Sequence, residues 1–162
     1  MQYYKFHIIL ILTSGIFFPE VQLHIGSWLK LKGRVFYDSK TKRLVKKLKA
    51  GDIALISHKD IDSLAALELI KSKIKAIINL EKSISGSYPN EGPLLLLNQG
   101  IKIYDNCDKS ILKNIKNGDE LELIEGKIYK NEDLISSCKC LQKKEVNKLI
   151  KNAKLNRNNL LN

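Results

Sequence analysis

The feature that most constrains the fold of this chain is a regular alternation of short apolar runs and amphipathic segments between Asp52 and Lys116. Short apolar runs bounded by turn residues are typical of buried strands, and the segments between them have the apolar spacing of helices. Three strand–helix units in succession predict a parallel sheet. The predicted strands are Asp52–Ser57, Lys75–Asn79 and Ile101–Asp105, and the predicted helices span 62–72 (with Leu64, Leu67 and Ile70 facing inward), 93–99 and 109–116.

The segments on either side predict antiparallel additions to this sheet. Lys32–Asp38 alternates as a strand does, and a basic segment, Lys40–Lys49, follows it. After the Asn117-Gly118 turn, Glu125-Gly126 predicts a hairpin between two strands, and a third short strand is expected near 134–136. The predicted fold class is therefore α/β: three βα units forming a mainly parallel sheet, with terminal antiparallel hairpins.

This order of elements is similar to the swivelling β/β/α domain of phosphoenolpyruvate-utilising enzymes. The comparable segments here are SISGSYPNEGP, GIKIYD and NGDELEL. In swivelling phosphotransfer domains the loop that corresponds to the first segment carries the phosphohistidine. No histidine follows His58 in this chain, so the analogy excludes phosphorelay through that loop.

The chain divides into three predicted parts: 1–30, 31–140 and a lysine-rich helix within 141–162. The apolar run Phe6–Phe18 is shorter than the roughly 20 residues that span a bilayer. Three interpretations of residues 1–30 stay open: a translation artefact upstream of the true start, a membrane-associating segment, or a signal-like segment with a poor cleavage site. The tail helix, from about 142 to 161, places Val146, Leu149, Ile150, Ala153 and Leu160 on one side.

The formal charge of +11 raises the question of a nucleic-acid or membrane partner. Nearly all of this charge is lysine, since Arg34, Arg43 and Arg157 are the only arginines. Specific base readout depends largely on the bidentate arginine side chain. The composition therefore favours a solvated lysine surface, and no specific nucleic-acid partner is predicted.

The cysteines and histidines predict neither a disulfide framework nor a metal site. Cys107, Cys138 and Cys140 form an odd and sparse set, and the C-x-C pair lacks two further ligands at suitable spacing. The histidines His7, His24 and His58 have no partner motif, so no catalytic residue is assigned.

The candidate binding residues lie in the loops that follow the three predicted parallel strands. Carboxyl ends of parallel strands share one edge of a sheet, where ligands of open α/β folds bind. Gly86 and Gly92 would allow a ligand to approach the backbone, and the helix that begins near Pro93 would present free N–H groups to an anion. A purely structural loop is the alternative. The candidate set is His58, Asp60, Asp62, Ser83, Ser85, Gly86, Tyr88, Asn90, Asp105 and Asn106.

Three motifs together resemble the N-terminal region of SteA-like cytokinetic ring proteins, also called thiamin pyrophosphokinase-like proteins. These are GDIALISHKDID, SISGSYPN with its following GP, and GIKIYDN, and the similarity covers about Leu31 to Leu134. The resemblance implies a domain that precedes a thiamin pyrophosphokinase-like domain in proteins associated with cell division. This chain stops about where that second domain should begin, so ATP and thiamin are expected as cofactors only of the absent domain and none is expected here.

The resemblance implies a non-catalytic binding or regulatory module. Two alternatives stay open: a subunit or fragment of a nucleotide-binding enzyme that a separate chain completes, and a lysine-rich protein of nucleic-acid or membrane surfaces. The expected partners are a thiamin pyrophosphokinase-like domain or a cell-division protein. The expected location is cytoplasmic, and one of the open interpretations of residues 1–30 adds membrane association through residues 6–18.

Overall fold

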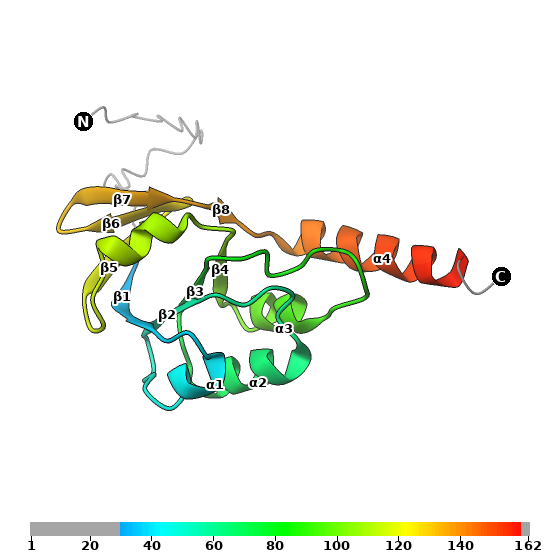
Figure 1. The fold of residues 1–162 in the computed structure, drawn as a ribbon, viewed down its shortest axis with the longest axis horizontal. Helices are drawn as coiled ribbons and strands as arrows, with labels where there is room; N and C mark the ends of the chain where they lie inside the picture. The colour runs from blue at the N-terminus through cyan, green and yellow to red at the C-terminus, as the bar shows by residue number, and fades with distance from the viewer. Residues whose placement is uncertain (1–29, 160–162) are drawn as a thin grey trace, which may run out of the picture.

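A computed structural model of the chain describes residues 30–159 and confirms the α/β class predicted from the sequence (Figure 1). Helices and strands alternate through the first half, and short antiparallel strands dominate the second. The elements in chain order are β1 (Lys30–Tyr37), α1 (Thr41–Leu44), β2 (Ile53–Ile56), α2 (Ser63–Lys71), β3 (Ala76–Asn79), α3 (Gly92–Asn98), β4 (Lys102–Asp105), the 3-10 helix η2 (Lys109–Lys113), β5 (Glu120–Ile124), β6 (Lys127–Lys130), β7 (Asp133–Ser137), β8 (Lys139–Cys140) and α4 (Lys143–Asn159).

The strands form one eight-stranded mixed sheet in the order β7-β6-β5-β1-β2-β3-β4-β8. Strands β1 to β4 are parallel neighbours, with Val35 opposite Ile53, Ile53 opposite Ala76, and Ala76 opposite Lys102. The predicted parallel arrangement of the three strands after Asp52 is therefore confirmed, and β1 joins them as a fourth. The first half of β1 pairs antiparallel with β5, which brings the hairpins β5–β6 and β6–β7 into the same sheet.

The sheet curls until its two outer strands come together. Strands β7 and β8 lie at opposite ends of the strand order, yet only Cys138 separates them in the chain. The N–H of Cys138 donates to the carbonyl of Gly126, in the β5–β6 turn, over 2.7 Å. Figure 1 shows β7 running directly into β8 above the parallel strands. The curled sheet therefore encloses an interior between its parallel and antiparallel parts.

Two apolar cores lie on opposite faces of the parallel strands, because successive strand residues point to opposite sides. In β2, Ala54 and Ile56 face the four α-helices, whereas Ile53 and Leu55 face the interior of the curled sheet. Leu121, Leu123 and other apolar residues of the antiparallel strands fill that interior, and η2 contributes Ile111. The layers are thus antiparallel strands, parallel strands and helices.

Local sequence signals explain several element boundaries. The Asp62 side chain accepts the N–H of Ala65 over 2.8 Å, so Asp62 is the N-cap of α2. The β5–β6 turn has positive φ angles at Glu125 (47°) and Gly126 (87°). Such a two-residue turn matches the twist of the strands that it joins.

The predicted inward face of the helix over 62–72 is wrong for Leu64 and Leu67, whereas Ile70 packs against the helix-side core as predicted. Leu64 and Leu67 are 70% and 46% exposed, whereas Ala65, Ala66 and Leu69 are buried in the helix-side core. Aliphatic residues occupy more than one face of this short helix, so periodicity could not select the buried one. The prediction for 109–116 is also partly wrong, because that segment forms a 3-10 helix that ends at Lys113.

The prediction of no disulfide is contradicted by a bond between Cys107 and Cys138, whose Cα atoms are 4.9 Å apart. Cys107 follows β4 and Cys138 precedes β8, so the two meet only because the sheet curls. Cys140 has a free thiol, and burial raises its pKa. The bond ties the antiparallel layer to the end of the parallel sheet.

The predictions for residues 1–30, including the apolar run 6–18, fall almost wholly outside the described residues. Within the described part of the chain, no helix is both long and apolar enough to cross a bilayer. Lysine dominates the exposed side of α4, and Val146, Ile150 and Ala153 are its buried residues, as predicted. The prediction for Leu160 lies outside the described residues.

Candidate binding rim at the carboxyl ends of the parallel strands

Four loops meet where the parallel strands end, and we call this surface the carboxyl rim. It consists of four segments that lie at or directly after the ends of β1, β2, β3 and β4, namely residues 38–41, 57–62, 80–91 and 105–107. The loops adjoin because their strands are parallel neighbours. The sequence predicted that the last three would meet, and the structure brings them together through direct hydrogen bonds.

Asn79, the last residue of β3, joins the loops at the centre of the rim. It is fully buried. Its Oδ1 accepts the N–H groups of His58 (3.0 Å) and Glu81 (3.2 Å). Its Nδ2 donates to the carbonyl of His58 (2.8 Å) and to Oγ of Ser83 (2.9 Å). Every donor and acceptor of this amide is therefore used to hold two adjacent loops. The sequence analysis did not select Asn79.

The loop after β2 lies alongside the loop after β3 as a short ladder. The N–H of Asp60 donates to the carbonyl of Lys82 over 2.9 Å, and the N–H of Ile61 donates to that of Ser83 over 3.0 Å. The Asp60 carboxylate accepts the N–H of Ser85 over 2.5 Å. Asp60 has a φ of 55°, a left-handed conformation that aspartate tolerates better than most residues.

The loop after β4 closes the other side of the rim. The Asp105 carboxylate, almost fully buried, accepts the N–H of Ser83 over 2.7 Å. Asn106 has a φ of 52°, and its N–H donates to the carbonyl of Glu81 over 3.3 Å. Ser83 and Asp105 therefore fix the position of the rim, whereas Asn106 contributes its backbone N–H and has an exposed side chain.

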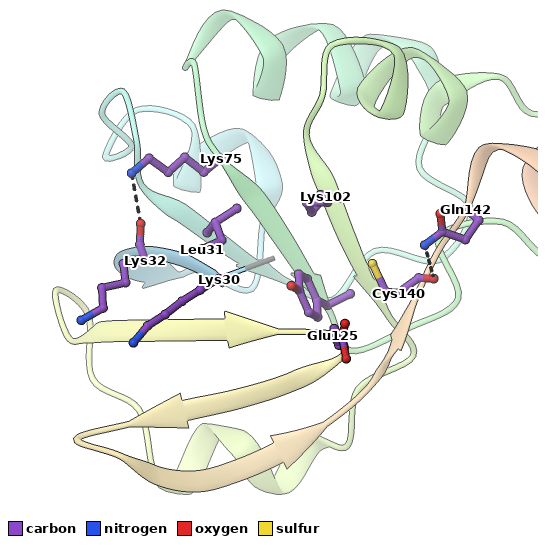
Figure 2. A pocket seen from close by; sticks show the side chains of 9 residues that line it. Lys30, Leu31, Lys32, Lys75, Lys102, Glu125, Cys140 and Gln142 are labelled. Atoms are coloured by element: carbon purple, nitrogen blue, oxygen red, sulfur yellow. Dashed lines mark hydrogen bonds between the residues drawn. The ribbon is translucent and has the colours of Figure 1, made fainter. Parts of the chain in front are cut away.

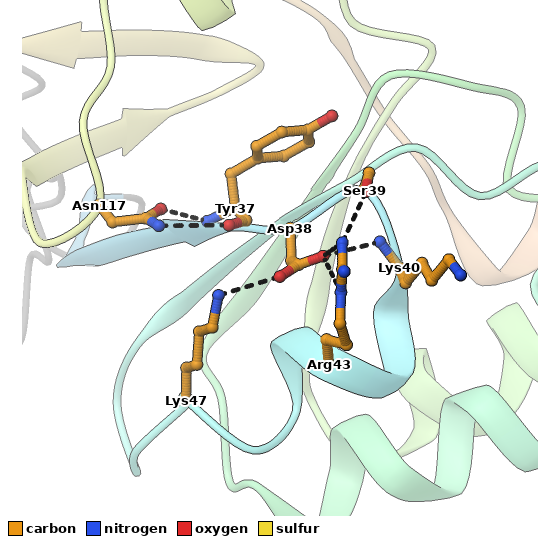
Figure 3. A network of polar contacts seen from close by, with 7 residues as sticks. All are labelled: Tyr37, Asp38, Ser39, Lys40, Arg43, Lys47 and Asn117. Carbon is orange, nitrogen blue, oxygen red and sulfur yellow. Dashed lines mark hydrogen bonds and ion pairs between the residues drawn. The ribbon is translucent and has the colours of Figure 1, made fainter.

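The sequence analysis missed the fourth loop of the rim, which follows β1. Oγ1 of Thr41 lies 3.1 Å from Nδ1 of His58. Asp38 accepts hydrogen bonds from the backbone of Lys40 (3.0 Å), from Nε of Arg43 (2.9 Å) and from Nζ of Lys47 (2.9 Å). Figure 3 shows these donors gathered around the Asp38 carboxylate. The sequence signal that could have identified this loop is an acidic residue at the end of a predicted strand, the pattern also seen at Asp105.

Asp38 is expected to remain ionised at unusually low pH. The ammonium of Lys47, the backbone N–H of Lys40 and the guanidinium of Arg43 hold the pKa of Asp38 well below the usual 3.8. A lowered folded-state pKa stabilises the fold at pH values above the unfolded pKa, and that contribution is lost as the pH falls through the folded pKa. NMR titration of the Asp38 carboxyl carbon should show its midpoint below 3.8. Lys47→Met should move the midpoint upward, and an unchanged midpoint would contradict this assignment.

Both glycines predicted to admit a ligand are packed against the chain itself. A Cβ on Gly92 would lie 2.0 Å from the carbonyl oxygen of Ile61, and a Cβ on Gly86 would lie 3.0 Å from Leu149 of α4. The start of α3 therefore abuts the start of α2 and does not open towards a ligand. The prediction that these positions and the α3 N-terminus receive an anion is not supported by this packing. The N–H groups of Ser85, Ser87 and Gly92 are also bonded, to Asp60, Ser85 and Asn90 respectively.

The outer surface of the rim carries the remaining candidates. Tyr88 is 47% exposed, and partial burial raises its pKa, with the charges of Asp60 and Asp62 adding to the effect. Leu64, in the first turn of α2, is also exposed. Asn90 is buried, and its Nδ2 has no hydrogen-bond partner among residues 30–159. The rim therefore combines an internally bonded interior with an exposed aromatic and aliphatic exterior.

His58 is the one histidine of the rim, and it contacts two polar side chains. Nε2 of His58 lies 3.8 Å from the Asp62 carboxylate, and Nδ1 lies 3.1 Å from the Thr41 hydroxyl, so the imidazole is held between a hydroxyl of the loop after β1 and a carboxylate of its own loop. Within the described part of the chain, no three His, Cys, Asp or Glu side chains are grouped as metal ligands.

Helix α4 lies along the loop after β3 and extends away from the body of the domain. Leu149 packs against Gly86, and Nζ of Lys154 lies 3.3 Å from the Glu91 carboxylate. Figure 1 shows the far end of α4 projecting beyond the helices that cover the sheet. The chain therefore leaves the domain beside the carboxyl rim.

Comparison with models of protein families and with curated proteins gave no match for this chain. Among solved structures, it is similar to 3-isopropylmalate dehydratase from Methanocaldococcus jannaschii, with 15% sequence identity and a TM-score of 0.42. That similarity covers 82% of this chain and 97% of the other.

Proposed function

We propose that this chain is a non-catalytic binding module that docks another protein domain on its carboxyl rim. The observation that carries the proposal is the division of the rim into two parts. Its interior polar groups, apart from Nδ2 of Asn90, bind one another, whereas Tyr88, Leu64 and Leu67 are exposed at or beside its edge. Tyrosine and exposed aliphatic side chains are suited to protein contacts, since they bury large area with few rotamers.

The carboxyl rim fits a protein surface better than a free anion. The backbone N–H groups that would hold a phosphate are already bonded within the loops. The outer charges are mixed, with Asp62 and Glu91 beside the exposed Lys59 and Lys82. A partner domain can match such a mixed surface, whereas a small anion would meet carboxylates as well as lysines.

The resemblance to SteA-like proteins suggests which partner to expect. In a protein of that kind a thiamin pyrophosphokinase-like domain would follow the helix that corresponds to α4, which leaves the domain beside the carboxyl rim. We propose such a domain, or a cell-division protein that carries one, as the occupant. ATP and thiamin would then bind to the partner, and this chain would position or regulate it.

The test is an NMR titration of the isotope-labelled full chain with a separately expressed kinase-like domain from a full-length relative. Amide shifts should centre on Ser85, Gly86, Tyr88 and Asn90. The double variant Leu64→Ala/Tyr88→Ala should weaken binding at least tenfold, because exposed aromatic anchors carry much of the energy of an interface. An assay of thiamin and ATP turnover in the mixture examines the alternative, in which the two chains form one enzyme.

The matched control is Leu134→Ala, since Leu134 is 55% exposed on β7 in the antiparallel layer. It should leave the affinity unchanged. Equal losses in the control and the double variant, or no rim shifts at millimolar partner, would contradict the docking proposal. Turnover that requires both chains would favour the enzyme alternative.

A further inference from the structure

A second candidate site lies at the opposite edge of the sheet, where the parallel strands begin. There a cavity of about 520 Å³ opens between the first half of β1, the start of β4 and strand β8. Figure 2 shows its lining side chains arranged around the opening of the curled sheet. Mouths of curled or closed sheets are common places for small-molecule sites, and this volume is within their usual range of roughly 300–1,000 Å³.

Four lysines from separate parts of the chain line this cavity: Lys30 and Lys32 on β1, Lys75 before β3, and Lys102 at the start of β4. Lys30 and Lys32 share the Glu122 carboxylate, and the Lys30 pair is 2.6 Å long. Nζ of Lys75 donates to the carbonyl of Lys32 over 3.1 Å, as Figure 2 shows. Lys75 and Lys102 have no ion pair with any described residue.

The charges around the cavity favour a doubly charged anion. Its lining includes one carboxylate, Glu125, in addition to the Glu122 that neutralises Lys30 or Lys32. Four ammonium groups against two carboxylates leave a net charge of +2. A phosphate monoester carries nearly two negative charges at neutral pH, and lysine binds phosphate as a point charge.

Tyr104 supplies an observation that does not depend on the lysines. It lines the cavity and is only 3% exposed, and its hydroxyl, which is not fully enclosed by protein atoms, makes no hydrogen bond to the described residues. A hydroxyl that faces a cavity without a protein partner is free to donate to a ligand there. Burial raises the pKa of Tyr104 to about 12, so the group remains an O–H donor at neutral pH. Tyr104 and Lys102 are two residues apart on β4 and therefore face the same side of the sheet.

The remaining wall is suited to an organic group. Leu31 and the half-buried Cys140 line the cavity beside the Tyr104 ring, and Cys140 is opposite Tyr104 in the β4–β8 pairing. A phosphate ion alone would fill little of this volume. Glu125 can accept a hydrogen bond from a hydroxyl or amino group at the far end of a larger ligand.

We propose that this cavity binds a small phosphorylated organic molecule, with its phosphate at Lys75, Lys102 and the Tyr104 hydroxyl. The organic part lies against Leu31 and Cys140. This site is separate from the carboxyl rim, so it provides a means for a small molecule to bind while a partner domain is docked.

The test is an NMR titration of the full chain with AMP, ribose 5-phosphate, inorganic phosphate and succinate. Shifts from the organic phosphates should centre on Leu31, Lys75, Lys102, Tyr104 and Gln142, with a dissociation constant below about 1 mM. Lys75→Met/Lys102→Met should weaken binding at least tenfold. Tyr104→Phe, which keeps the packed ring, should weaken it about two- to tenfold through loss of one hydrogen bond.

The matched control is Lys144→Met/Lys148→Met, which removes two exposed lysines of α4 and should leave the affinity unchanged. Thermal unfolding of each variant shows whether it is folded. Equal weakening by the control, or shifts spread over α4, would show non-specific attraction to lysine and overturn the proposal. Succinate binding as tightly as the organic phosphates would overturn the choice of phosphate, and no shifts at 10 mM of any probe would overturn the site.

Discussion

Replacing Asn79 by alanine is expected to lower the free energy of unfolding by about 3 kcal/mol or more, because several buried polar groups lose their partners together. The side chain makes four hydrogen bonds, to the N–H and carbonyl of His58, the N–H of Glu81 and Oγ of Ser83. It is fully buried, so water cannot readily replace these contacts.

Urea denaturation at neutral pH measures this loss, and a matched control is Asn98→Ala at the exposed end of α3. That control should change stability by less than about 0.5 kcal/mol. In the folded fraction of the Asn79 variant, amide shifts should appear in the loops after β2 and β3. A loss below about 1 kcal/mol would show that the loops of the carboxyl rim hold their positions without Asn79.

Reducing the disulfide between Cys107 and Cys138 is expected to lower the free energy of unfolding by about 3–4 kcal/mol. The two cysteines are 31 residues apart. A cross-link closing a loop of that length stabilises mainly by restricting the unfolded chain, and the chain-entropy relation gives this magnitude. The bond also ties the segment before β8 to the end of β4, so its loss should loosen the antiparallel layer.

Urea denaturation with and without reductant measures the effect, and Cys107→Ser should reproduce the reduced curve. Cys140→Ser is the control, because Cys140 is outside the bond and its variant should keep the full response to reductant. Equal midpoints in both conditions, or three titratable thiols in the oxidised protein, would contradict the bond.

This result also bears on where the protein works. The resemblance to SteA-like proteins predicts a cytoplasmic location, and cytoplasmic thiols are normally kept reduced. A stable bond between Cys107 and Cys138 is more typical of an oxidising compartment. A thiol-trapping assay on cells that express the natural protein would show which of these two expectations holds.

The carboxyl rim could be predicted from the sequence only in part. Consecutive strand–helix units force the loops after β2, β3 and β4 to one edge, so His58, Ser83 and Asp105 could be grouped without coordinates. Whether each of these side chains faces a ligand or bonds to the chain itself depended on tertiary contacts. Ser83 and Asp105 bond to the chain itself, and Asn79, which holds the loops together, resembled any other strand residue.

The sequence by itself determined the positions of the parallel strands and of the helices after β2 and β3, because apolar periodicity and turn residues act within a few residues of where they stand. Only the tertiary structure decided which face of α2 is buried, which strands pair with β1, and which cysteines meet. Leu64 and Ala65 are adjacent in sequence, and packing against the sheet chose between them. Cys107 and Cys138 meet only because the sheet curls. These outcomes depend on contacts between residues far apart in the chain, and no local signal encodes such contacts.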